Sequence, residues 1–377
     1  MGVGVLQPAS ERTLNFSSGP AMLPEEVLRR AQGAIWDLDG SGIGVLEHSH
    51  RGPAFMKVAE RAERVVREVG GVPDDYAVLF VQGGASSQFF TVPMNLLPAG
   101  ATADYCNTGV WSQKAISEAR RLGQVHVACS SEATAFDHIP GPDATTWSAA
   151  PAYVHVTSNN TIYGTQWRRE PEVPAGVPLV CDASSDLFSR PIDVRRYGLI
   201  YAGAQKNLGI AGLTLVIARR DLIAHGRADV PTMLQYRTHE LAGSMHNTPP
   251  TFAIWVLAEV VSWIAAHGGL PAMAERNQAK AALLYDVLDG ARAFRPVARA
   301  DSRSLMNVVF RAATPALERE LLARAEARGL DGLAGHRTVG GLRASIYNAF
   351  PEDGVRRLVA LLAELEAEHA GAVRASE

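Results

Sequence analysis

The sequence has few cysteines, no long uninterrupted apolar run and no block of like charge, and each shortage excludes a class of protein. Its three cysteines, Cys106, Cys129 and Cys181, lie far apart and outside any CxxC or Cys/His spacing. This spacing argues against a disulfide framework and against a zinc site, and no metal is expected. The longest apolar stretch, residues 252–266, is interrupted by Glu259 and is too short to span a bilayer comfortably.

The charges are also close to balance, with a formal net charge of −3 and no basic cluster. Binding to nucleic acid or to a membrane surface is therefore not expected as the main role. The N-terminus lacks the basic start and the continuous apolar core of a signal peptide. Together these features predict a soluble cytoplasmic protein with a substantial buried core.

Lysine is scarce: four of the 36 basic residues are lysines, and one of the four is unusual. Lys57, Lys114 and Lys280 lie in amphipathic helical patterns, where we expect them on solvated helix faces. Lys206 lies instead in an apolar, glycine-rich run that has no other charge, LIYAGAQKNLGIAGLTLVIA. A lysine in such a run is either paired with a carboxylate or has a chemical role.

The first 250 residues alternate strand-like and helix-like patterns. Seven runs read as buried strands, at residues 76–81, 102–106, 124–129, 152–157, 177–183, 199–203 and 213–218. Such alternation predicts an α/β fold with a mostly parallel seven-stranded sheet covered on both faces. After a helix predicted at residues 251–267 the pattern changes to α+β. We divide the chain into an N-terminal segment (1–15), a large domain (16–262) and a small C-terminal domain (263–377).

Chemically useful residues follow several of these strands, and ligands of open α/β sheets gather at the carboxyl ends of strands. The segment GGASSQF, with Ala85 and Ser86, follows the first strand and opens a helix, which suits either a phosphate or a structural turn. Asp182 closes a buried strand, and Lys206 follows the next one. A buried lysine and a carboxylate are what pyridoxal 5'-phosphate (PLP) chemistry needs, because the lysine forms an imine and the carboxylate keeps the pyridine nitrogen protonated. A buried ion pair between Lys206 and Asp182 is the alternative.

Two arginine-bearing segments are flanked by glycines. One holds His50 and Arg51, and the other holds His336, Arg337 and Arg343. The planar guanidinium group suits bidentate binding of a carboxylate or a phosphate. Two such clusters fit a substrate that is anionic at both ends, although scattered surface arginines are common in this chain.

Seven segments of the chain occur in the same order as the signature segments of a known family, namely NFSSGPAMLP, SHRG, GGASSQF, SRPIDV, YGLIYAGAQKN, GSMHNTPPTF and GHRTVGGLRASIYN. On these segments nearly the whole chain resembles the phosphoserine aminotransferase family. The resemblance implies the fold type I architecture of PLP-dependent transferases and a homodimer with active sites at the subunit interface. It also implies transamination between L-glutamate and 3-phosphohydroxypyruvate in serine biosynthesis. Some relatives carry GGGRGQF, with an arginine where this chain has Ser86, which puts part of the electrostatic attraction for phosphate in doubt.

The resemblance also implies a role for individual residues. Lys206 would hold PLP as a Schiff base, Asp182 would pair with the pyridine nitrogen and Trp111 would stack on the ring. The remaining cofactor contacts would come from Ala85, Ser86, Thr161 and Gln205, and from Asn247 and Thr248 of the partner subunit. Arg343 would bind the substrate α-carboxylate, and His50, Arg51, His336 and Arg337 would form the pocket for the distal anion.

Several alternatives remain. The phosphorylated hydroxythreonine of pyridoxine biosynthesis has the same two anionic ends as phosphoserine. An alanine–glyoxylate-type aminotransferase would leave the His-Arg clusters without a distal anion, and a cysteine desulfurase would need a thiol on a mobile loop. A non-catalytic phosphate-binding protein would have no use for an isolated lysine such as Lys206.

Overall fold

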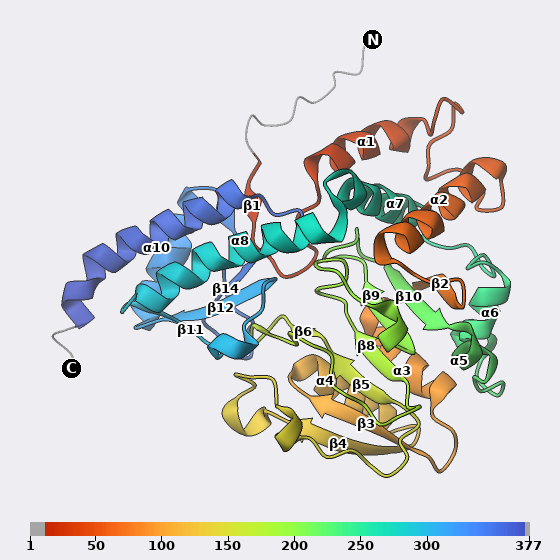
Figure 1. The fold of residues 1–377 in the computed structure, drawn as a ribbon. Helices are drawn as coiled ribbons and strands as arrows, with labels where there is room; N and C mark the ends of the chain where they lie inside the picture. The colour runs from red at the N-terminus through yellow and green to blue at the C-terminus, as the bar shows by residue number, and fades with distance from the viewer. Residues whose placement is uncertain (1–11, 374–377) are drawn as a thin grey trace.

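A seven-stranded sheet forms the centre of the larger of two lobes (Figure 1) in the computed structural model, which describes residues 12–373. In spatial order its strands are β2 (Tyr76–Gln82), β10 (Leu213–Arg219), β9 (Leu199–Gly203), β8 (Leu179–Asp182), β5 (Val154–Thr157), β3 (Thr102–Asn107) and β4 (Gln124–Ser130). Strand β10 runs antiparallel to both of its neighbours, and all the other pairs are parallel. The predicted mostly parallel seven-stranded sheet is confirmed.

Helices cover both faces of this sheet, because its strands are apolar on both sides. Along β2, Val78 and Phe80 face one helical layer while Leu79 and Val81 face the other. The first layer contains α1 (Glu25–Trp36), α2 (Pro53–Gly70) and α7 (Thr251–Ala266). The second contains α3 (Gly84–Leu96), α4 (Val110–Ala119), α5 (Arg220–Ala224) and α6 (Tyr236–Leu241).

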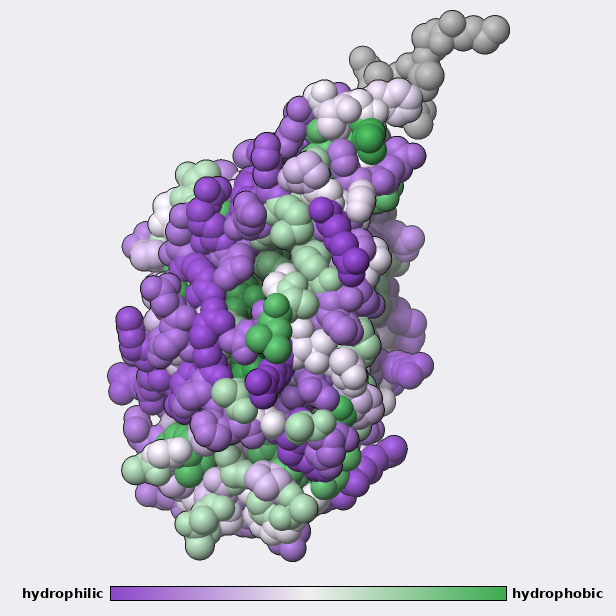
Figure 2. Space-filling model, turned by 90° about the vertical axis from the view of Figure 1, so that its right-hand side faces the viewer, coloured by the Kyte–Doolittle hydropathy of each residue, from purple (hydrophilic) through white to green (hydrophobic). Residues whose placement is uncertain are grey.

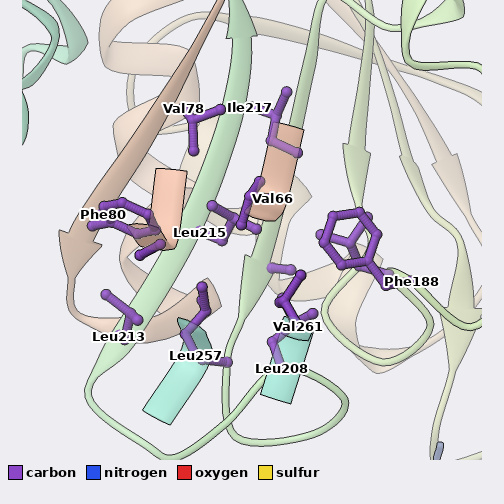
Figure 3. Packing of buried hydrophobic residues seen from close by; sticks show 14 of the residues in the cluster. Val66, Val78, Phe80, Phe188, Leu208, Leu213, Leu215, Ile217, Leu257 and Val261 are labelled. Atoms are coloured by element: carbon purple, nitrogen blue, oxygen red, sulfur yellow. The ribbon is translucent and has the colours of Figure 1, made fainter. Parts of the chain in front are cut away.

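The core under α2 and α7 also fixes the chain next to Lys206. Figure 3 shows Leu208, two residues beyond that lysine, among apolar side chains that include Leu257 and Val261 of α7. Leu208 is 1% exposed, and burying a leucine of this kind is worth roughly 1.5–3 kcal/mol. The turn that bears Lys206 is therefore anchored from below by the large core.

Helix α7 is the apolar run noted in the sequence. Its interrupting Glu259 is buried and forms ion pairs with Arg30 of α1 and Arg61 of α2. Among residues 12–373 no single helix is both long and apolar enough to cross a membrane; α7 and α8 (Gly269–Gly290) meet that criterion only as a pair, which is bent by 84°.

The smaller lobe is built on a second sheet. Strands β11 (Phe294–Pro296), β12 (Asn307–Ala312) and β14 (Leu342–Ser345) form it, all antiparallel, and α8, α9 (Pro315–Ala327) and α10 (Glu352–Val373) pack beside it. The short β1 (Leu14–Asn15) pairs with β13 (Leu330–Asp331) of this lobe. Strand β11, which is short and ends in proline, was not predicted. The predicted boundary at 262/263 falls inside α7, and the division into domains stays a prediction; residues 1–11 lie outside the described part.

The expectation that Lys280 lies on a solvated helix face is wrong. It is 2% exposed, and its Nζ donates hydrogen bonds to the backbone oxygens of Ile346, Tyr347 and Phe350 at 2.9, 2.6 and 3.1 Å. The three carbonyls satisfy the three donors of the ammonium group, which makes its burial tolerable. Lys280 shares the buried face of α8 with Asn277 and Leu284, and this i−3, i+4 spacing was the signal in the sequence.

Candidate active site

A cavity of about 550 Å³ lies where the carboxyl ends of the central strands face the small lobe. Nine of the predicted site residues line it, namely Ala85, Ser86, Trp111, Thr161, Asp182, Gln205, Lys206, His336 and Arg343. They come from both lobes and from positions more than 250 residues apart. Tertiary folding thus assembles a site that the linear order only suggested.

Lys206 lies in the turn after β9 and faces the cavity. Burial lowers the pKa of its ammonium group, and the carboxylates of Asp182 and Asp186 oppose that shift. Asp182 acts on Lys206 through its charge, and no direct hydrogen bond joins the two side chains within residues 12–373. Gly19 packs on its aliphatic stem, since a Cβ at this glycine would lie 3.5 Å from Lys206 Cγ.

Asp182 ends β8 and is 5% exposed. Its Oδ1 accepts hydrogen bonds from the backbone N–H and the hydroxyl of Ser184, at 3.0 and 2.6 Å. Burial raises the pKa of this carboxyl, while Lys206 and Ser184 lower it. Ser184 was not predicted; an acidic residue followed two positions later by serine, as in an Asx-turn, was the available signal.

Thr157 was also missed. It lies opposite Asp182 in the β5–β8 register and lines the cavity. Its Oγ1 is buried and has no hydrogen-bond partner within residues 12–373. Because a buried hydroxyl is normally paired, this one indicates a polar ligand in the cavity.

The glycine-rich segment after β2 supplies a cradle. Gly83 and Gly84 have φ values of +99° and +66°, which favour glycine, and the following residues open α3 with their backbone N–H groups unpaired by the helix. A Cβ on Gly203 would lie 2.8 Å from Gln205 Oε1 and 3.5 Å from the Ala85 nitrogen. A side chain at position 203 would therefore collide with Gln205, and the missing Cβ lets Gln205 pack against β9 beside the start of α3. The unpaired backbone N–H groups at that helix start suit an anionic group.

Arg343 reaches the cavity from β14 of the small lobe. One guanidinium nitrogen, Nη1, donates to the Thr161 backbone oxygen at 3.1 Å, while Nε is buried and without a partner in the described chain. Burial lowers the pKa of this guanidinium group, which nevertheless stays charged because arginine titrates so high. A buried cation with an unused donor is suited to bind a carboxylate. His336 lies at the same wall, and burial lowers its pKa, as does the charge of Arg343.

Five predicted site residues do not line this cavity. His50 and Arg51 lie in the loop before α2, and Arg337 is exposed. Asn247 lines a different cavity of about 310 Å³, on the other side of Gly83, and the Thr248 backbone oxygen accepts from Gln82 Nε2 at 3.0 Å. The fold of one chain therefore does not bring these five residues into the lining of the Lys206 cavity.

The large α/β lobe, the small lobe and the lysine between them define a fold type I aminotransferase. The chain matches the family described as Aminotransferase class-V over residues 13–358. A phosphoserine aminotransferase of Desulfotalea psychrophila is 53% identical over 350 residues, which are 93% of this chain and 96% of that protein. The chain belongs to the class-V aminotransferases and, within them, to the phosphoserine aminotransferase family.

Solved structures agree. The phosphoserine aminotransferase from Bacillus circulans subsp. alkalophilus superposes with a TM-score of 0.93 at 46% identity, covering 96% of this chain and all of that one. The PLP-bound phosphoserine aminotransferase from Trichomonas vaginalis gives a TM-score of 0.90 at 36% identity, covering 93% of this chain and all of that one. The predicted fold class and enzyme class are confirmed.

Proposed function

We propose that this protein is a PLP-dependent enzyme that transfers the amino group of L-glutamate to 3-phosphohydroxypyruvate. The products would be O-phospho-L-serine and 2-oxoglutarate, which places the enzyme in serine biosynthesis and, we propose, in the cytoplasm. The observation that carries the proposal is the meeting of Lys206, Asp182 and Arg343 in one cavity. The names of the family members described above support the substrate and do not favour the alanine–glyoxylate or pyridoxine-pathway alternatives.

The residues of the cavity fit PLP. The unpartnered Thr157 hydroxyl and the backbone donors at Ala85 and Ser86 suit a flat ring with a phosphate tail. When bound, PLP supplies an aldehyde that condenses with amines and a ring that accepts the electron pair of the substrate α-carbon. Trp111 offers a flat face to such a ring, and the Asp182 carboxylate would hold a proton on its nitrogen.

Lys206 has two tasks. Burial favours its neutral amine, which would hold the cofactor covalently and would move a proton at the substrate α-carbon. Arg343 would bind the α-carboxylate and so present the α-hydrogen to Lys206 Nζ. The burial of Arg343 limits water around its guanidinium group, which strengthens its attraction for an anion.

A second copy of the chain would complete the site. His50, Arg51, Asn247 and Thr248 do not line their own chain's cavity, and we propose that they reach the cavity of the partner in a homodimer. Support comes from the side of the molecule at the right of Figure 1, where apolar side chains gather in a hollow among polar ones (Figure 2). Trp36 of α1 and Leu241 of α6 are 86% and 77% exposed, respectively, and Leu46 just before His50 is 55% exposed. Large exposed apolar groups are typical of subunit contacts.

The deciding experiment compares two acceptors with glutamate as donor. We expect kcat/KM for 3-phosphohydroxypyruvate to exceed that for hydroxypyruvate on the order of 100-fold or more, because only the former has a distal anion for His336 and Arg337. Arg337→Ala should reduce this ratio and leave PLP affinity unchanged. Equal use of the two acceptors would overturn the substrate assignment, and absence of a visible band from bound PLP would overturn the cofactor.

A further inference from the structure

Asn207, the residue after Lys206, connects the lysine to two other segments of the site. Its Nδ2 donates to the backbone oxygen of Ser185, in the loop that follows Asp182, at 3.3 Å. Its Oδ1 accepts from the backbone N–H of Asn348, in the small lobe, at 3.0 Å. Asn207 is 4% exposed, so water does not offer an alternative partner for these groups.

Asn348 uses its side chain to join the two lobes. Its Nδ2 donates to the Phe188 backbone oxygen of the large lobe at 2.9 Å, and its Oδ1 accepts from Asn277 Nδ2 of α8 at 2.8 Å. It is 5% exposed and lies five residues after Arg343, in the turn that leaves β14. One side chain thus ties the Arg343 strand to the loop of Asp182, while its backbone meets the neighbour of Lys206.

Lys280 holds the same turn from the other side. It lies one helical turn after Asn277 on α8, and the carbonyls it binds belong to Ile346, Tyr347 and Phe350, on both sides of Asn348. Moving the turn would leave several buried polar groups without partners. Because leaving a buried polar group without a hydrogen-bond partner costs free energy, the turn has one favourable position.

We propose that Asn348 is a positioning residue that sets the distance and orientation of Arg343 relative to Lys206. The proposal rests on the proposed function, in which Arg343 binds the α-carboxylate and Lys206 moves the α-proton. A substrate held at one end by Arg343 presents its α-hydrogen correctly only if the two groups keep their spacing. Displacements of about 1 Å can cost on the order of 100-fold in rate.

The test is Asn348→Ala in the holoenzyme. The substitution removes the bonds to Phe188 and Asn277 but keeps the backbone donor to Asn207. We expect kcat/KM for glutamate to fall on the order of 100-fold, through a higher KM and a lower kcat together, because both carboxylate binding by Arg343 and presentation of the α-hydrogen to Lys206 suffer. PLP affinity, measured by titration of the apoprotein, should stay within about twofold, since its contacts lie in the large lobe.

Asn95→Ala is the matched control. Asn95 is also 4% exposed and does not line the Lys206 cavity. Its Nδ2 donates to the backbone oxygens of Thr91 and Leu234, both at 2.8 Å, and its Oδ1 accepts from the backbone N–H of Tyr236 at 3.1 Å. Both variants should lower the melting temperature. Only Asn348→Ala should raise KM for glutamate while PLP affinity stays unchanged.

Unchanged KM and kcat in Asn348→Ala, with a melting temperature lowered as in Asn95→Ala, would show a purely structural role and overturn the proposal. If Asn348→Ala does not fold, Asn277→Ala removes one of the two bonds and should raise KM by a smaller factor; no rise there overturns the proposal too. Wild-type protein measured in parallel distinguishes failure of this positioning proposal from failure of the proposed function. Failure of wild type to bind PLP or to transaminate overturns the proposed function itself.

Discussion

Trp111 and Thr161, which both line the active-site cavity, are joined by a hydrogen bond: the indole Nε1 donates to Thr161 Oγ1 at 3.0 Å. Trp111 lies in the first turn of α4, and Thr161 lies between β6 (Asn159–Asn160) and β7 (Thr165–Gln166). The bond fixes the plane of the indole, whose centre is 5.7 Å from Lys206 Nζ. Two predicted cofactor residues thus orient one another.

Thr161→Val should weaken PLP binding. The substitution keeps the shape of the side chain but removes the acceptor for the indole, at a cost of about 1 kcal/mol, or roughly fivefold in the dissociation constant. Titration of the apoprotein with PLP, followed by visible absorbance, measures the change. Thr134→Val, which removes a hydroxyl from a turn outside the cavity, is the control and should bind PLP as wild type does. Equal dissociation constants for both variants would contradict the prediction.

Lys206→Ala should abolish the visible band of covalently held PLP. It should also reduce the rate of transamination by about 10²–10⁴-fold, since both the covalent link and the proton carrier are lost. Lys114→Ala is a matched control, because its Nζ lies 4.6 Å from the same Trp111 ring but on the exposed side of α4. The control should keep the band and most of the activity. A band that survives in Lys206→Ala would refute the assignment.

Mixing two inactive variants tests the shared site. In a heterodimer of Lys206→Ala with Arg51→Ala chains, one site has both wild-type residues if Arg51 reaches across the interface. We expect activity to recover toward one functional site per mixed dimer after the two chains are refolded together. If Arg51 serves its own chain, or has no role in the site, the mixture will not exceed the sum of its components.

His155 predicts a pH dependence of stability. It is a buried residue of β5 in the central sheet, with Nε2 bonded to Tyr201 Oη at 2.9 Å, and burial lowers its pKa to about 3. Between pH 6.5 and about 3 the unfolded chain therefore binds a proton that the folded chain does not. The free energy of unfolding falls as pH falls through this window, by on the order of 1.4 kcal/mol per pH unit from this group.

Denaturant unfolding at several pH values measures this slope. His155→Gln, which retains a polar partner for Tyr201, should flatten it, while His225→Gln at the exposed end of α5 should not. A slope unchanged by His155→Gln would mean that other groups govern the acid response.

Lys280→Met should destabilise the fold through the turn at residues 346–350. Three buried carbonyls lose their donor, at a cost on the order of 3 kcal/mol in the free energy of unfolding. Lys57→Met, on the exposed face of α2, is the control and should change stability by less than about 0.5 kcal/mol. Denaturant titration compares the two, and equal stabilities would contradict the structural role of Lys280.

Much of the large lobe was predictable because its signals are local. Buried strands such as β9 and β10 read as continuous apolar runs, and the glycines after β2 indicate a tight turn into α3. Strands that are very short, or that depend on a partner strand far away in the sequence, gave weaker signals. Strand β11 has three residues, and β1 forms only because β13 offers an edge.

The sequence by itself determined the strand pattern of the large lobe and the exceptional position of Lys206, because a charge inside an apolar run is visible without any neighbour. Only the tertiary structure decided which side chains share a cavity with it. Arg343 and His336 reach it because the small lobe packs over the strand ends, whereas His50 and Arg51, equally suggestive in sequence, lie elsewhere on the same chain. It likewise decided that Lys280 is buried, since a helix pattern shows a face but not the turn that packs against it.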